Sequence, residues 1–378
     1  MLYLHNIPLT VPYLVALAIA SLAPSSALAQ GAPAVAALET PPAGGDGYAS
    51  LEAGAAFSTG AFSAFHNPAT LGELYRSTGA TFHAATVERS LLLPGTSVRH
   101  TGFAASLPST EGVDIGLSYS RTASDYGTVL LPSDSLPSMA DAYEHVHTFG
   151  LGVRLGMPVS VGGAVKFFES DLGAARATGW AYDVGLLLRP VLVSKTSSLY
   201  TETAPSAALV LQNLGQDVRY GSSMFSDPLP RTFRAAVGTE ARIADIAAVS
   251  IGWDLAKSVH RHADGGDVAQ TIGLSGALLG LRYSVGRLHD PEGYGNETHQ
   301  ALAYEFDLRQ WRRAAKRLRT GDFASSSAAL ESDDATNAGG FPAYRPNLRF
   351  IAGRKWISEN SSSSGRDGGD SWYFSVAL

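Results

Sequence analysis

The stretch GWAYDVGLLLR, residues 179–189, decides how the rest of this sequence is interpreted. Every second side chain in it is large and apolar, and those between, apart from Leu187, are small or charged. Because successive side chains of a strand point to opposite faces, this spacing predicts a β-strand with one apolar and one polar face. The apolar face comprises Trp180, Tyr182, Val184, Leu186 and Leu188.

The same alternation returns along the chain, for example over residues 113–120, 249–255, 300–308 and 372–378. Such repetition predicts an all-β protein of about fourteen strands, with boundaries good to a few residues. The predicted strands are 79–88, 97–107, 112–123, 143–156, 159–171, 177–190, 204–214, 231–243, 246–258, 268–278, 280–289, 297–310, 347–358 and 371–378.

The links between these strands alternate in length. Tight turns are predicted at 108–112, 156–158, 243–245 and 278–280, and long polar loops at 125–141, 216–230, 258–267, 289–296 and 359–370. Short turns at one end and long loops at the other are typical of barrels that cross an outer membrane. We therefore predict a transmembrane antiparallel β-barrel of about fourteen strands, with its apolar faces toward lipid.

Composition excludes several classes of protein. The chain has 378 residues, a net charge of -6, only 16% charged residues and no Cys. Nothing in this balance favours binding to nucleic acid. The absence of Cys rules out disulfides, thiolate metal sites and a thiol nucleophile.

The N-terminus indicates export. An apolar core at 11–23 is too short to span a bilayer, and Ala27-Leu28-Ala29 resembles a signal-peptidase site. We interpret 1–29 as a signal peptide cleaved near Ala29, the alternative being a buried helix, and 30–47 as a flexible leader. Together with the barrel, this predicts the outer membrane of a diderm bacterium, with membrane lipid as a partner.

The inward faces of the predicted strands carry charges of both signs, which should pair in a confined lumen. A lumen of about fourteen strands is too wide for wall side chains alone to fill, so it holds water or a plug. The lumen charges are Arg154, Lys166, Asp183, Arg189, Arg234, Asp254, Arg282, Glu305 and Asp307.

The plug we predict is residues 48–78, which precede the first strand and which we call the hatch. It contains Asn67, Pro68 and Ala69, where Pro68 fixes the backbone and Asn67 can cap the following turn. An ordinary helix start would have the same residues. Placed before a wide barrel, the motif is interpreted as the bend of the hatch.

The insertion 311–346 begins with WRRAAKRLR, a strongly basic and helical stretch. It is either a solvated helix below the barrel or a contact with phospholipid headgroups or an acidic partner on the periplasmic side.

No nucleotide-binding, hydrolase or zinc-protease motif occurs, so we expect no enzyme and no cofactor. The pairs His145/His147 and His260/His262 lack a visible third ligand, and we predict no metal at either.

Several motifs carry a family resemblance: GAAFSTGAFSAFHNPATL, GWAYDVGLLLRP, ALVLQNLGQDVRYG and PLPRTFRAAVGTE, from residue 54 onward. In these the chain resembles the PorV/PorQ family, outer-membrane barrels related to the FadL fatty-acid transporters. The family often has Gly where this chain has Thr70.

The resemblance implies two possible roles. One is an accessory of type IX secretion, with secreted cargo and translocon components as partners on the extracellular loops. The other is a FadL-like channel for long-chain fatty acids or other hydrophobic small molecules. Because a fatty-acid path should be apolar and the predicted lumen is charged, the sequence favours the secretion role.

Overall fold

A computed structural model describes most of the chain. The described residues are 35–42, 54–58, 60–74, 82–90, 96–107, 113–131, 138–155, 158–195, 200–224, 226–244, 246–259, 268–290, 295–321, 323, 349–359 and 370–377. The predicted signal peptide, most of the insertion at 311–346 and the pair His260/His262 lie outside them.

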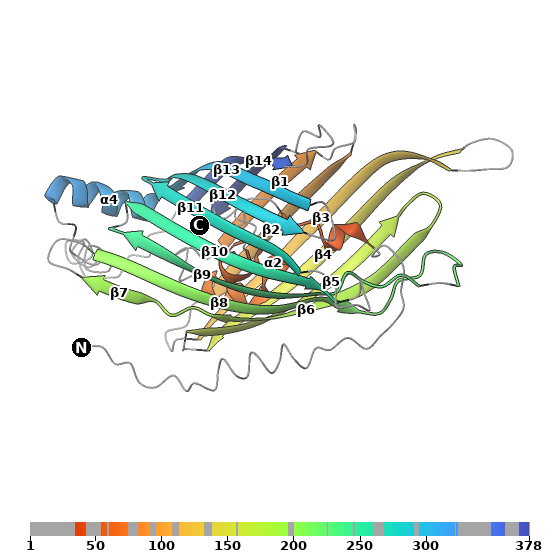
Figure 1. The fold of residues 1–378 in the computed structure, drawn as a ribbon, viewed down its shortest axis with the longest axis horizontal. Coiled ribbons are helices and arrows are strands. Elements are labelled where there is room, and N and C mark those ends of the chain that lie inside the picture. Colours follow the sequence, from red (N-terminus) through yellow and green to blue (C-terminus); the bar gives the residue numbers. More distant parts are fainter. Residues whose placement is uncertain are drawn as a thin grey trace.

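The described residues form fifteen strands in one antiparallel sheet (Figure 1). Pairing of the first strand with the last, and of β6 with β8, closes fourteen of them into a barrel; β7 pairs only with β8. The strands are β1 (Phe82–Ser90), β2 (Ser97–Leu107), β3 (Val113–Leu131), β4 (Ser138–Leu155), β5 (Val159–Asp171), β6 (Arg176–Leu188), β7 (Leu192–Lys195), β8 (Tyr200–Gly215), β9 (Thr232–Ile243), β10 (Ala247–Ser258), β11 (Val268–Leu278), β12 (Leu281–Asp290), β13 (Gly295–Asp307), β14 (Arg349–Glu359) and β15 (Asp370–Ala377).

The predicted all-β barrel is confirmed, and so is the direction of its faces. Trp180, Tyr182 and Val184 are exposed on the outside, whereas Ala181 and Asp183 between them are buried. The outer face is apolar on most strands, as in barrels that present their outer side chains to lipid. We call the barrel end with the β2–β3, β4–β5 and β11–β12 links the short-turn end, and the opposite end the long-loop end.

Two predicted connections differ from the structure. The loop expected at 125–141 is largely strand, because β3 and β4 continue to pair past a bulge between Asp125 and Thr128. The bulge, with Gly127 at a φ of 71°, interrupts the alternation, so the sequence did not mark the extension as strand. Between the predicted strands 177–190 and 204–214, the structure has β7 and the start of β8, which form a short hairpin.

The predicted basic helix is present as α4 (Leu308–Thr320) and starts three residues before 311, so it takes the end of the predicted strand 297–310. It follows β13 at the short-turn end (Figure 1). Over the described ranges, we find no helix with the length and hydropathy needed to cross a membrane.

The N-terminal segments lie inside the barrel. They comprise η1 (Ala36–Leu38), η3 (Gly54–Ala56), α2 (Ser63–His66) and η4 (Pro68–Glu73), the orange-red elements within the sheet in Figure 1. Nearly every described residue of 54–74 is buried. We predicted that 30–47 is a flexible leader. In its described part, 35–42, the structure instead shows Val35, Ala37 and Leu38 buried.

Candidate functional site: the hatch and its wall

Asn67 fixes the bend of the hatch. Its side chain accepts a hydrogen bond from the Ala69 amide (3.0 Å), and Pro68 follows as the first residue of η4. The same side chain donates to the carbonyl oxygens of Ala55 (2.8 Å) and Leu186 (3.4 Å). One amide therefore caps a turn, ties two parts of the hatch together and reaches the wall.

Thr70 completes this bend. Its hydroxyl donates to the Asn67 carbonyl oxygen at 2.7 Å, and the residue is buried. The position where the sequence departs from the resembling family is thus used to brace the turn locally.

A row of glycines forms the surface on which the bend rests. Gly116, Gly152, Gly162 and Gly185 are paired directly across β3, β4, β5 and β6. A Cβ at Gly152 would lie 2.5 Å from the Pro68 carbonyl oxygen, and one at Gly185 would overlap the side-chain oxygen of Asn67. The row allows the hatch backbone to approach the wall more closely than any side chain would permit.

The hatch spans the lumen from wall to wall. Phe57 is fully buried in a cluster with Leu187 and Val210 on β6 and β8. On another side of the barrel, Phe62 packs with Val87 of β1 and Ile351 of β14. The described part of the hatch therefore contacts strands far apart around the barrel.

A buried ion pair holds the hatch near the short-turn end. Glu73 lies 3.0 Å from the Arg154 guanidinium, which also lies 3.7 Å from Asp114. The Ser160 hydroxyl donates to Glu73 at 2.8 Å. Removing one member would leave a buried charge without its partner, which typically costs about 3–5 kcal/mol.

The other predicted lumen charges whose side chains are described also lie inside and have polar partners. Lys166 pairs with Asp183 at 2.7 Å, Arg189 with Glu240 at 2.8 Å, and Arg234 with Asp254 at 2.5 Å.

Three of the predicted lumen charges, namely Asp254, Lys166 and Arg282, make further contacts inside the barrel. The Asp254 carboxylate accepts the Ala55 amide of the hatch at 3.4 Å, and Lys166 lies over the Phe65 ring. Arg282 donates to Ser275 at 3.1 Å. Glu305 and Asp307 belong to β13, but their side chains lie outside the described residues.

The QNLG motif is explained by a bulge. Pairing of β6 with β8 shifts register between Tyr182 and Val184, and Asn213 has a positive φ of 57°. As a result, the consecutive residues Gln212 and Asn213 are both buried. Gln212 donates to the Phe65 carbonyl oxygen at 2.6 Å, and Asn213 accepts from Lys166 at 2.7 Å.

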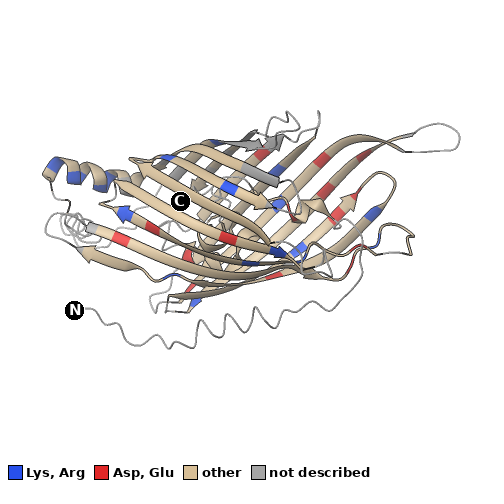
Figure 2. Cartoon of the chain, viewed as in Figure 1, with Lys and Arg blue, Asp and Glu red and all other residues tan. Residues whose placement is uncertain are grey.

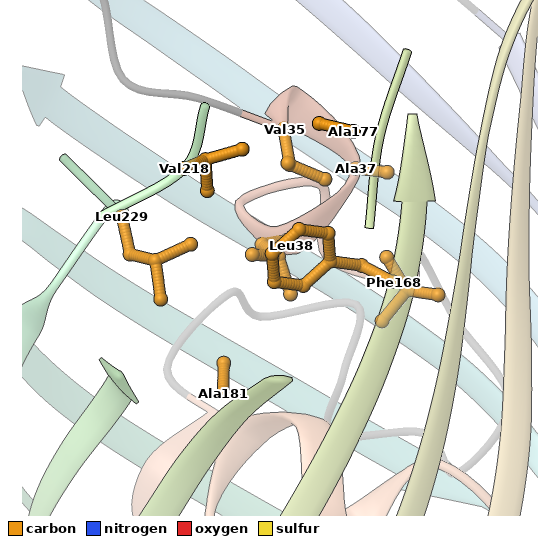
Figure 3. Packing of buried hydrophobic residues seen from close by; sticks show 9 residues of the cluster. Val35, Ala37, Leu38, Phe168, Ala177, Ala181, Val218 and Leu229 are labelled. Carbon is orange, nitrogen blue, oxygen red and sulfur yellow. The ribbon is translucent and has the colours of Figure 1, made fainter. Parts of the chain in front are cut away.

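A second contact region surrounds η1, toward the long-loop end. Val35 and Leu38 enter an apolar site on the wall (Figure 3). We call this the upper site; it is lined by Val146, Phe168, Ala177, Ala181, Val218 and Leu229. Two polar contacts between described residues hold η1 here: the Ala37 amide donates to the Glu144 carboxylate at 2.9 Å, and the Val35 backbone shares a hydrogen bond with the Tyr220 hydroxyl.

His66 is the least accommodated side chain of the hatch. It is 1% exposed, and neither ring nitrogen has a hydrogen-bond partner among the described residues. Burial lowers the pKa of His66 to about 3, and electrostatic interactions with Arg234, His100 and Lys166 act in the same direction. The ring is therefore neutral at ordinary pH, and protonation opposes its buried position.

No metal site is visible in the described part of the chain, where no three His, Asp or Glu side chains gather suitably. His147 shares a hydrogen bond with the Tyr119 hydroxyl (2.9 Å), and His145 with Arg121 (3.2 Å).

Sequence reasoning missed several residues that hold the N-terminal segments. Gly162 belongs to a strand whose alternation is weak at Gly162-Gly163, and Glu144 lies where the sequence predicted only a strand start. Glu73 was placed in the hatch without a partner. Charge balance could have pointed to one missing acid, such as Glu73 or Glu240, since the predicted lumen set had five cations against four acids.

No protein-family pattern matches the sequence, and no curated protein matches it either. Among solved structures, the toluene transporter TbuX of Ralstonia pickettii is 12% identical, with 90% of this chain and 98% of that chain covered and a TM-score of 0.43. The toluene transporter TodX of Pseudomonas putida gives 9%, 86%, 96% and 0.41, and a FadL homologue of Pseudomonas aeruginosa gives 10%, 86%, 94% and 0.40. Similarities this low carry no information about what the chain binds.

Proposed function

We propose that the chain is an outer-membrane channel for a hydrophobic small molecule, closed at rest by its own N-terminal segments. The observation that carries this proposal is the filled lumen: the hatch reaches strands on opposite sides of a fourteen-strand barrel. A barrel of this size has room for a passage, and a segment that fills it regulates that passage.

The upper site supports the choice of a hydrophobic substrate. Its lining is apolar, it lies toward the long-loop end where a molecule from outside would arrive, and η1 occupies it with Val35 and Leu38. A site that accepts two aliphatic side chains can accept an apolar molecule of similar size in their place. Entry of the substrate then requires displacement of η1.

The lumen charges do not oppose this reading, although they favoured the secretion role at the level of sequence. Lys166, Arg189 and Arg234 each face a carboxylate at ion-pair distance. Charges neutralised in pairs on the wall leave the path beside them less polar than their number suggests.

The secretion hypothesis has less support. The motifs that carried the family resemblance, around Asp183, Gln212 and Asn213, are buried and contact each other or the hatch. Packing of the hatch explains them without a cargo protein. A cargo surface would instead lie on the long loops, and only the ends of these motifs, 216–221 and 228–230, reach one of them.

Location is tested first. Outer-membrane fractionation, with migration on a gel before and after heating, should show a barrel that stays folded in detergent. Recovery in the soluble fraction would refute the membrane location.

Uptake tests the substrate class. Cells that lack their own transporter should take up a labelled long-chain fatty acid or toluene faster when they express the chain. A chain whose barrel is folded in the membrane and which raises uptake of neither probe would contradict the channel proposal. Loss of cargo secretion on deletion, in a host with a type IX system, would support the secretion role instead.

A further inference from the structure

The helix α4 is unusual in its charge. Its thirteen residues, Leu308–Thr320, include six Lys or Arg and no acidic residue. Figure 2 shows these cations gathered on a helix that extends from the short-turn end of a barrel whose strands are largely uncharged. Neutralising this charge requires something other than the helix itself.

One side of α4 is buried. Ala314 and Arg317 are buried, with Arg317 0% exposed. These two positions are three residues apart and hence on one face of the helix. The opposite side is therefore the one available to a partner.

The outward side carries an apolar stripe beside a basic one. Trp311 and Leu318 are 53% and 60% exposed and lie seven residues apart, so they share a face. Arg312 and Arg319 are also exposed, have the same spacing and lie about 100° further round the helix. Ala315 lies between the two stripes and is exposed.

This arrangement selects a lipid surface over an acidic protein. The apolar stripe follows the lipid-facing side chains Leu302 and Tyr304 of β13, which leads directly into α4. A helix that places Trp and Leu at the edge of an apolar belt, with Arg beside them, has the pattern of a segment lying in the membrane interface. The basic stripe is then at the depth of the phosphates.

We propose that α4 lies on the membrane surface at the short-turn end and binds the headgroups of anionic phospholipid there, with phosphatidylglycerol as the test lipid. The proposal rests on the membrane location of the barrel but not on its substrate.

The absence of Cys allows a direct test. Ala315→Cys places a single fluorophore on the exposed face, and the full chain is reconstituted in nanodiscs of phosphatidylcholine and phosphatidylglycerol. Bromine on the tails of one lipid or the other then reports which lipid surrounds the label. Ser222→Cys, exposed at the long-loop end, supplies the control label.

We expect brominated phosphatidylglycerol to quench the Ala315 label beyond its share of the lipid, and to show no such excess at Ser222. The double variant R312Q/R319Q should lower the affinity for phosphatidylglycerol by about fivefold for each cation removed. High salt should weaken the preference similarly. The matched control R99Q/R219Q, which removes two cations at the long-loop end, should leave it unchanged.

The variant W311S/L318S should lower quenching by both lipids, because the label then lies further from the bilayer. Equal quenching by the two lipids in the unmodified chain would overturn the proposal and favour an acidic protein as the partner. Failure of the chain to enter nanodiscs at all would instead contradict the membrane location.

Discussion

The hatch core at Asn67–Glu73 and the η1 segment are both buried in the lumen, but they are held differently. The hatch core lies on bare glycine backbone and has hydrogen bonds and an ion pair to the wall. The η1 segment is held mainly by apolar packing, with hydrogen bonds from its backbone to Glu144 and Tyr220. The first needs an exact backbone approach, whereas the second depends on a surface that other apolar molecules can use. This difference suggests that the hatch core is a fixed closure of the barrel. The η1 segment, in contrast, competes with the substrate for the upper site and can be displaced from it.

The largest effect should come from filling the glycine row. Gly185→Val places side-chain atoms where the Asn67 side chain lies, so the hatch should no longer pack against the wall. The closed channel should then open, and its ion conductance should rise. Single-channel recording checks this. Gly163→Ala is the matched control, because a Cβ there meets its nearest neighbour at an ordinary 3.6 Å. A closed channel in the Gly185 variant would mean that the hatch does not depend on the row.

Shortening one buried leucine in each region should separate their roles. Leu38→Ala removes packing from the upper site and should weaken the seat of η1 by about 2–5 kcal/mol. Uptake of a hydrophobic probe should rise, while the channel should stay closed to ions. Leu71→Ala, in the hatch core, should instead raise conductance. Identical behaviour of the two variants would erase the distinction between the regions.

Asn67→Ala tests the bend itself. It removes the cap of η4 and leaves the Ala55 and Leu186 carbonyl oxygens without this donor, which should destabilise the seated hatch by about 1–3 kcal/mol. Brief openings in single-channel records should become more frequent. An unchanged opening frequency would show that the bend forms without its cap.

Acid should loosen the hatch through His66. In the seated hatch its pKa is lowered to about 3, whereas in water it titrates near 6.5. The unseated state therefore binds the extra proton between these values, and the seated state loses stability as pH falls below 6.5. The loss is at most about 1.4 kcal/mol per pH unit.

Open probability recorded from pH 7 to pH 4.5 checks this. The variant His66→Phe keeps an aromatic ring without the titration, so its response should be flatter than that of the unmodified chain. The same pH response in both would assign the effect to other groups.

The strands could be predicted from the sequence because one physical rule governs them. Lipid outside and a packed lumen inside favour alternation, and segments such as 179–189 display it with Leu187 as the one large apolar residue on the inner face. The extension of β3 and β4 past Asp125 was missed because the bulge at Asp125–Thr128 interrupts the alternation.

The site could be predicted only in outline. Asn67 and Pro68 predict a bend, and the mixed lumen charges predict ion pairs. Which residues pair with each other depends on the register of the strands and on the path of the hatch, which the sequence does not show. The alignment of Gly116, Gly152, Gly162 and Gly185 arises only when four strands are paired. The burial of Val35 and Leu38 was hidden because a short segment rich in Ala and Pro has no periodicity.

The central claim, that the N-terminal segments close the barrel, is tested most directly by deleting residues 54–74 and recording conductance in planar bilayers. Heat-modifiable migration would first establish that the shortened chain still forms its barrel. The account predicts a closed full-length channel and a steadily open deletion variant. A folded deletion variant that conducts no more than the full-length chain would contradict it.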